Sequence, residues 1–318
     1  NQAANLDVET SENSIQESIA QIYIQILYAA ESVKVNENTL QVSIAQRDRG
    51  QELLNAGSIA KSDLAQLEAQ VSTDRYQLVT AQATLQDYKL QLKQLLELDG
   101  ENEMNVYLPA LSDENVLLPL PTKKDVYMSA LTLRPEIEAS KLSVEASELG
   151  IDIAKAGYLP TISLSAGIGT NHTSGSDFTF GEQVKNGWNN SIGVSVSVPI
   201  FNNRQTKSAV QKAKLQRETS LLSLLDEQKT LYKTIEGLWL DANSAQQRYA
   251  AANEKLKSTQ ISYDLISEQF NLGMKNTVEL LTEKNNLLQA QQEQLQAKYM
   301  AILNTQLLKF YQGDKLAL

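Results

Sequence analysis

The stretch FNLGMKNTVELL, residues 270–281, interrupts a long segment that otherwise has the composition of continuous helix. LNAGSIAKSDLA, residues 54–65, has the same pattern 216 positions earlier, so that Gly57 aligns with Gly273. A glycine in the left-handed backbone conformation commonly ends a helix. We therefore predict that the chain turns back on itself at both glycines, whatever its function is.

The repeat continues on both sides of the two glycines. Aligned pairs upstream are Ile19 with Ile235, Tyr23 with Trp239, and Ala29 with Ala245. Downstream, both copies continue as Gln- and Leu-rich helices that end near Gly100 and Gly313. Ser62 and Thr277 are plausible N-caps for these returning helices. The pattern predicts two αα-hairpins with very long arms.

The prolines divide the chain into three parts. All six lie between Pro109 and Pro199, and the two ends are rich in Ala, Leu, Gln, Lys and Glu. Proline inside a helix costs about 3 kcal/mol, so the proline-free ends favour uninterrupted helices. A helix over residues 204–270 would be on the order of 90–100 Å long. Helices of this length need partners along their sides.

The middle of the chain has a different pattern. Residues 101–133 mix turns with short pieces, and residues 134–158 read as a helix with Pro135 in its first turn. Residues 159–203 then alternate with a period of two, which predicts two strands joined by a polar loop. The alternating apolar residues are Ile162, Leu164, Ala166 and Ile168 in the first strand, and Ile192, Val194, Val196 and Val198 in the second.

The alternation has two interpretations. A soluble antiparallel sheet with one wet side gives it, and so does a strand of a membrane barrel. A lone hairpin between long helices needs other chains to complete its sheet, which favours the barrel. Phe178, Phe180 and Trp188 would then form an aromatic belt at the membrane interface.

Composition argues against several classes of protein. The net charge of −10 argues against nucleic-acid binding. The sequence contains no cysteine, which excludes disulfides, thiolate metal sites and cysteine nucleophiles, and its only histidine, His172, lies in a polar loop. We find no phosphate-binding loop and expect no enzyme activity, cofactor or metal. The longest apolar runs are too short for a membrane helix, and no signal peptide is visible.

With two long hairpins and this strand pair, three short motifs resemble the TolC-like outer-membrane efflux factors. They are LRPEI at 133–137, AGYLP at 156–160 and VPIF at 198–201. The resemblance implies a mainly α fold with a small β part. Three protomers would form a twelve-stranded barrel in the outer membrane of a Gram-negative cell, continued by an α-helical barrel in the periplasm.

The resemblance divides the chain into six parts. These are a first helical hairpin (1–100), an equatorial segment (101–133), a helix (134–158), the β-hairpin (159–203), a second helical hairpin (204–313) and a tail (314–318). The family's first repeat also has two strands and an inbound helix, which this chain lacks. We therefore expect that the N-terminal part of the first repeat, with any signal or lipid anchor, is missing here. With two strands per protomer, the chain as written could not close the family's barrel.

The function implied is that of a passive exit duct. Such a homotrimer serves a tripartite efflux pump or a type I secretion system, and exports small molecules or proteins. Its partners would be a periplasmic adaptor, an inner-membrane pump and outer-membrane lipid, with the adaptor contacting the tips at Gly57 and Gly273. Two other readings are a periplasmic adaptor itself and a coiled-coil structural protein of the envelope.

The resemblance also implies a gate at the hairpin tips. Its members would be Ser62 and Asp63 in the first tip, with Phe270 and Lys275 in the second, and Asp63 would form an ion pair with Lys275. Phe270 stands where the best-known member has a tyrosine, so a hydroxyl link is lost.

A pore ring lies close to this gate in the family. Glu279 matches the first position of an acidic ring that narrows the pore, while Thr282 takes the second position, where an acid is usual. One ring of three carboxylates would favour cations.

Overall fold

The computed structural model describes residues 2–98, 104–109, 116–175 and 177–316. The chain divides into two compact units, one made of residues 1–138 with 228–318 and the other of residues 139–227. The helices α4 and α6 contribute to both units. Each unit is described on its own below.

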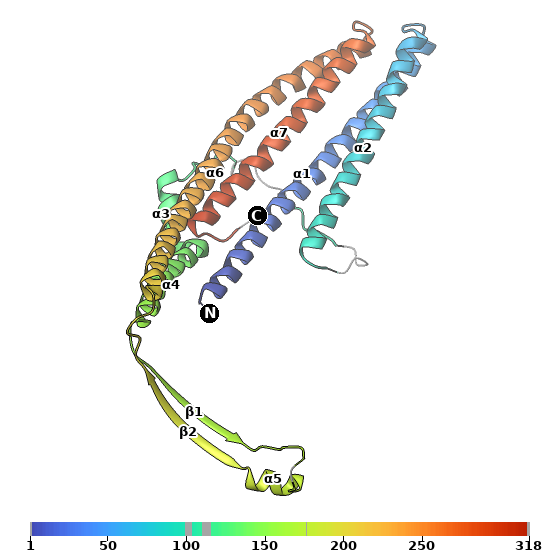
Figure 1. The fold of residues 1–318 in the computed structure, drawn as a ribbon. Coiled ribbons are helices and arrows are strands. Elements are labelled where there is room, and N and C mark those ends of the chain that lie inside the picture. The colour runs from blue at the N-terminus through green and yellow to red at the C-terminus, as the bar shows by residue number, and fades with distance from the viewer. Residues whose placement is uncertain (1, 99–103, 110–115, 176, 317–318) are drawn as a thin grey trace. The chain divides into compact units, whose positions relative to one another are not determined.

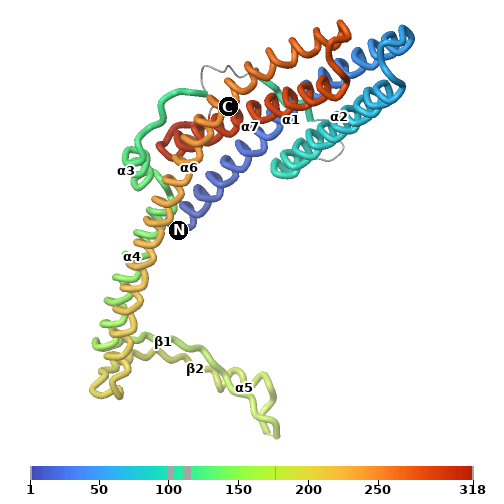
Figure 2. Tube along the Cα trace, turned by 90° about the horizontal axis from the view of Figure 1, so that it is seen from above, coloured from blue at the N-terminus to red at the C-terminus, as the bar shows by residue number. Residues whose placement is uncertain are grey.

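The first unit is built from long helices. α1 (Gln2–Asn55) and α2 (Lys61–Leu95) form one hairpin, and α6 (Gln205–Asn271) and α7 (Thr277–Gln312) form the other. Figures 1 and 2 both show the arms of each hairpin side by side, with α7 lying beside α1. This confirms the predicted fold class and its very long αα-hairpins.

The two turns have the same backbone geometry. Gly57 and Gly273 both have φ of +74°, in the left-handed region where a side chain is strained. The amide of each glycine donates to the carbonyl three residues before it, over 2.9 Å in both turns. The next amide donates to the carbonyl five residues before it, again over 2.8 Å in both. The internal repeat is therefore a structural repeat.

The predicted N-caps were wrong by one or two residues. Ala60 precedes α2, and the amide of Ala60 donates to Asp63 Oδ2 over 3.0 Å. Asn276 precedes α7, and its side chain accepts from the amide of Glu279 over 2.9 Å. Ser62 and Thr277 lie inside the first turns instead. In both hairpins an acid three residues after the cap reaches back to the cap's amide, and this contact sets where the helix begins.

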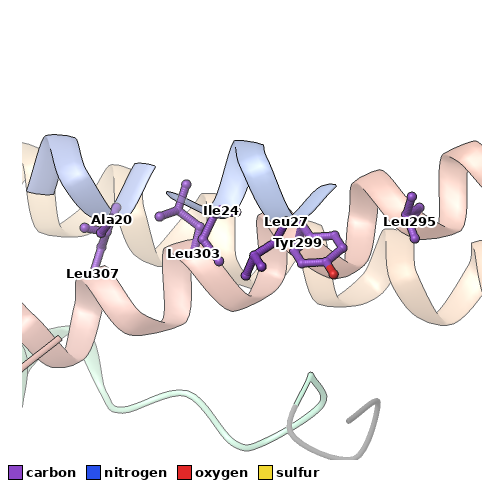
Figure 3. Close-up of a cluster of buried hydrophobic side chains, with 7 residues drawn as sticks. All are labelled: Ala20, Ile24, Leu27, Leu295, Tyr299, Leu303 and Leu307. Atoms are coloured by element: carbon purple, nitrogen blue, oxygen red, sulfur yellow. The ribbon is translucent and has the colours of Figure 1, made fainter. Parts of the chain in front are cut away.

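The two hairpins share a core between α1 and α7. Figure 3 shows the α1 side chains meeting those of α7 in one row. The cluster consists of Ala20, Ile24, Leu27, Leu295, Tyr299, Leu303 and Leu307. Because α1 and α7 come from opposite ends of the sequence, burying these side chains joins the two hairpins within one chain.

The described part of the equatorial segment lies on α6. Gln246 Nε2 donates to the carbonyls of Val116 and Leu118 over 2.9 and 2.8 Å, and Trp239 Nε1 donates to the carbonyl of Pro121 over 3.1 Å. The segment then enters α3 (Lys123–Leu133), a helix that the sequence did not predict. Thr122 caps it by accepting from the amide of Asp125.

Arg134 joins three helices after α3 ends. It is 8% exposed, and its guanidinium pairs with Glu17 of α1 over 2.8 Å and with Glu136 over 3.0 Å. It also lies over the ring of Tyr311 in α7, 3.9 Å from the centroid. Here α7 ends at Gly313, whose φ is +107°. Gly100, the matching end predicted for the first hairpin, lies outside the described residues.

The second unit contains the rest of α4 (Pro135–Ala156) and a β-hairpin. β1 (Thr161–Gly169) pairs antiparallel with β2 (Asn189–Ser197), and the short helix α5 (Phe180–Asn186) lies in the loop between them. The sequence predicted both strands but not α5. Ile162 pairs with Val196 and Leu164 with Val194, whereas Ser163 pairs with Ser195. One face of the ribbon is therefore apolar, and the other carries small and polar residues.

Every residue of the two strands is exposed in the single chain. On the apolar face, the exposed fraction reaches 76% at Leu164 and 82% at Ile192. Among the described residues, we find no helix with both the length and the apolar character that crossing a membrane requires.

Candidate functional site

The tips of the two hairpins pack against each other. Phe270 is 2% exposed and contacts a cluster that contains Leu53, Leu67 and Leu280, so that all four long helices contribute one side chain. The sequence placed Phe270 at the gate as a replacement for a hydroxyl link. In the structure its ring is an apolar anchor between the two tips.

Two hydrogen bonds near this cluster also connect α1 to α6. Gln46 Nε2 donates to the Tyr263 hydroxyl over 2.8 Å, and Arg49 Nη2 donates to the carbonyl of Asn271 over 3.1 Å. Burial raises the pKa of the Tyr263 hydroxyl above its usual value, so it stays neutral over the physiological range. Sequence reasoning did not find this contact, because nothing local links residues so far apart in the chain.

Lys275 and Glu279 form an ion pair within the second tip. Lys275 Nζ lies 2.5 Å from Glu279 Oε1. The hydrogen bond from Lys275 lowers the pKa of the Glu279 carboxyl, and the bond from the Asn276 amide lowers it further. Glu279 is therefore ionised, with an ammonium group directly beside it.

The predicted gate residues do not all meet within one chain. Asp63 is engaged by the amide of Ala60, and it is not paired with Lys275 in the part of the chain that the structure describes. Ser62 is exposed on the first turn of α2. The pair that the sequence predicted between Asp63 and Lys275 remains a prediction about neighbouring protomers.

The turns themselves are open to solvent. Around Gly57 and Gly273 there is free space where a side chain would stand. Leu272 and Met274 flank the second glycine and are 69% and 70% exposed. The second tip thus presents two apolar side chains outward, which is unusual for a loop unless another molecule covers them.

A buried polar cluster lies further from the tips, where α1, α2 and α7 meet. Lys284 Nζ donates to Asp74 Oδ2 and to Ser43 Oγ, and Ser43 in turn donates to Asp74 Oδ2. The other carboxylate oxygen, Oδ1, accepts from Gln70 Nε2 over 2.9 Å. Asp74 is 1% exposed and Lys284 is 3% exposed. Burial lowers the pKa of the Lys284 ammonium, while the bond to Asp74 acts in the opposite direction.

The sequence held a signal for this cluster that we did not use. Lys284 stands between Leu280 and Leu287, at the spacing of a buried helical stripe. Asp74 follows Leu67 and Val71 at the same spacing. A charged residue of each sign on two apolar stripes indicates a buried pair.

Nothing in the described residues resembles a catalytic or metal centre. No group of three or more His, Cys, Asp or Glu side chains is arranged to hold a metal ion there. His172 is exposed, and its Nδ1 lies 3.1 Å from Gln183 Oε1.

Comparison with known families gives one match. Residues 126–313, more than half of the chain, match the family described as "Outer membrane efflux protein".

Curated relatives are similar over nearly the whole chain. The outer membrane efflux protein BepC of Brucella suis biovar 1 (strain 1330) is 25% identical over 294 residues, which are 92% of this chain and 61% of BepC. The outer membrane protein TolC of Escherichia coli (strain K12) is 25% identical over 311 residues, covering 93% of this chain and 60% of TolC. The chain thus spans about 60% of the length of these relatives.

Solved structures share the fold. The outer membrane protein VceC of Vibrio cholerae superimposes with a TM-score of 0.78 at 17% identity, covering 99% of this chain and 74% of VceC.

Proposed function

Because the chain belongs to the outer membrane efflux protein family, we propose that it forms the exit duct of a tripartite efflux pump or a type I secretion system. Substrates, either small molecules or proteins, pass through it passively across the periplasm and the outer membrane. The observation that carries this proposal is the β-hairpin, whose apolar face is fully exposed in the single chain.

Family membership answers the coarser questions. The chain is an outer membrane protein of a non-enzymatic transporter family, as the sequence predicted. It also argues against the two other readings, a periplasmic adaptor and a structural coiled-coil protein.

The β-hairpin supports a barrel shared by three chains. Two strands alone are at best marginally stable, so further strands must pair with the outer edges of β1 and β2. In a closed barrel, the face with Leu164 and Val194 meets lipid, and the face with Ser163 and Ser195 lines the interior. Outer-membrane lipid is therefore a direct partner of the apolar face.

The long helices support the same homotrimer. α2 exposes Tyr76, Val79 and Leu90, which are large apolar side chains without cover in one chain. An open groove between α6 and α7 has small side chains along it, including Ala251 and Ala297. A row of large side chains packs well against such a groove of small ones, so neighbouring protomers would cover both surfaces and close a helical tube.

The tips would be the periplasmic gate. In the trimer, Asp63 of one protomer lies near Lys275 of the next and competes with Glu279 for its ammonium. Such a pair, exposed to water, would contribute only about 0–1 kcal/mol, which suits a gate that must open. Ser62 and Phe270 complete the contact, Ser62 through its exposed hydroxyl and Phe270 by fixing the second tip against the first.

Two further sites follow from the gate. Glu279 would form the acidic ring of the pore, and Lys275 beside it would moderate the preference for cations. The exposed Leu272 and Met274 support a contact between the tips at Gly57 and Gly273 and a periplasmic adaptor, which would connect the duct to an inner-membrane pump.

Cell fractionation and planar-bilayer recording of the full-length protein test the proposal. We expect a heat-modifiable outer-membrane trimer that conducts ions. Replacing Asp63 and Lys275 with alanine should raise the single-channel conductance, because the tips are then loosened. A verified trimer with unchanged conductance would contradict the gate, and a protein absent from the outer-membrane fraction would contradict the duct.

A further inference from the structure

Three kinds of contact join the two hairpins of one chain near the tips. They are the apolar cluster around Phe270, the hydrogen bond from Gln46 to Tyr263, and the buried cluster of Ser43, Asp74 and Lys284. The buried cluster is the most demanding of the three to break. Asp74 and Lys284 are nearly without solvent contact, so parting them would leave two unpaired charges inside the protein.

The internal repeat shows that this cluster has no counterpart. The 216-residue offset that aligns Gly57 with Gly273 relates Ser43 to Thr259, Asp74 to Ala290, and Lys284 to Glu68. Ala290 has no polar side chain, and Glu68 is exposed. The second set of positions therefore cannot form a buried ion pair of this kind.

This asymmetry matters in the trimeric tube of the proposed function, on which the inference rests. Hairpins would alternate around such a tube, so each hairpin meets the other hairpin of its own chain on one side and a neighbouring chain on the other. The contact within the chain contains the buried pair. The contact between chains relies on exposed groups such as Asp63 and Lys275, which water can replace at little cost.

We propose that the two hairpins of one protomer move as a single rigid body when the duct opens, held by Asp74 and Lys284, and that the contacts which part are those between protomers. Asp74 and Lys284 are thus positioning residues for the gate. They touch no substrate and hold the two tips in one fixed arrangement.

Chemical cross-linking within one chain tests this directly. Gln77 of α2 and Gln292 of α7 line the same groove between the hairpins, and the sequence has no cysteine that would interfere. The full-length protein with Gln77→Cys and Gln292→Cys is treated with a short bis-maleimide. A product that keeps the mass of one chain on a denaturing gel identifies the bridge within a protomer, and the two single-cysteine variants are the matched controls.

The bridged trimer is then opened by adding Asp63→Ala and Lys275→Ala, and its conductance is recorded in planar bilayers. We expect the same conductance with and without the bridge, because the bridge spans a contact that does not open. A bridge that abolishes the rise in conductance would overturn the inference.

A readout that needs no channel separates this inference from the proposed function. Thermal unfolding of Asp74→Asn, Lys284→Met and the double variant measures the coupling between the two residues. We expect the double variant to be more stable than either single variant, which ties the rigidity to this pair. Additive losses would show that the pair does not hold the hairpins together, even if the protein conducts.

Discussion

Replacing Leu164 with arginine tests whether the apolar face of the β-hairpin meets lipid. Leu164 is the fourth of nine residues in β1 and is 76% exposed in the single chain. A strand of this length spans about 30 Å, so its middle lies near the centre of the bilayer. An arginine on the lipid face costs about 2–4 kcal/mol at that depth. This loss corresponds to about 30- to 700-fold in the folding equilibrium of each chain.

Ser165→Arg is the matched control, because Ser165 is the next residue along the strand and lies on the opposite face. An arginine there would line the water-filled interior and cost far less. The assay is the yield of heat-modifiable trimer from outer membranes, together with refolding of the full-length protein into lipid vesicles over a urea series. Equal yields from the two variants would refute the assignment of the two faces.

Three further predictions concern the helical unit. Phe270→Ala should destabilise the protein by about 3–5 kcal/mol because it empties the cluster between the tips, whereas Phe270→Leu should cost much less; denaturant unfolding measures both. Lys284→Met should cost about 3–5 kcal/mol by leaving Asp74 buried and unpaired, and adding Asp74→Leu should recover most of this loss in the same measurement. The pKa of Glu279 is depressed, so cation selectivity in planar bilayers should persist as the pH falls to the usual glutamate pKa of about 4.3 and disappear only below it, whereas Glu279→Gln should lack it at every pH.

The parts of the fold that the sequence predicted well depend on local chemistry. Gly57 and Gly273 end helices because glycine adopts the left-handed conformation without strain, and both have the same positive φ. The strands around Leu164 and Val194 follow from alternation alone. The N-caps were misplaced because an acid three residues into the helix decides which residue precedes it, and we assigned the cap to the nearest hydroxyl instead.

The contacts that the sequence did not predict are between residues distant in the chain. The bond between Gln46 and Tyr263 depends on how two hairpins lie side by side, which no local pattern specifies. The pair of Asp74 and Lys284 was more accessible, since each residue interrupts an apolar stripe. Which residue of opposite charge each would meet still required the packing of α2 against α7.

The equatorial segment has a consequence for how this protein can vary. α6 holds it through side chains that donate to main-chain carbonyls, from Gln246 to Val116 and Leu118, and from Trp239 to Pro121. A carbonyl is the same in every amino acid, so the path of the segment does not depend on most of its own side chains. Mutational tolerance should therefore be high at Leu118 and low at Gln246 and Trp239, and the segment can be re-engineered as a binding surface without rebuilding the helix beneath it.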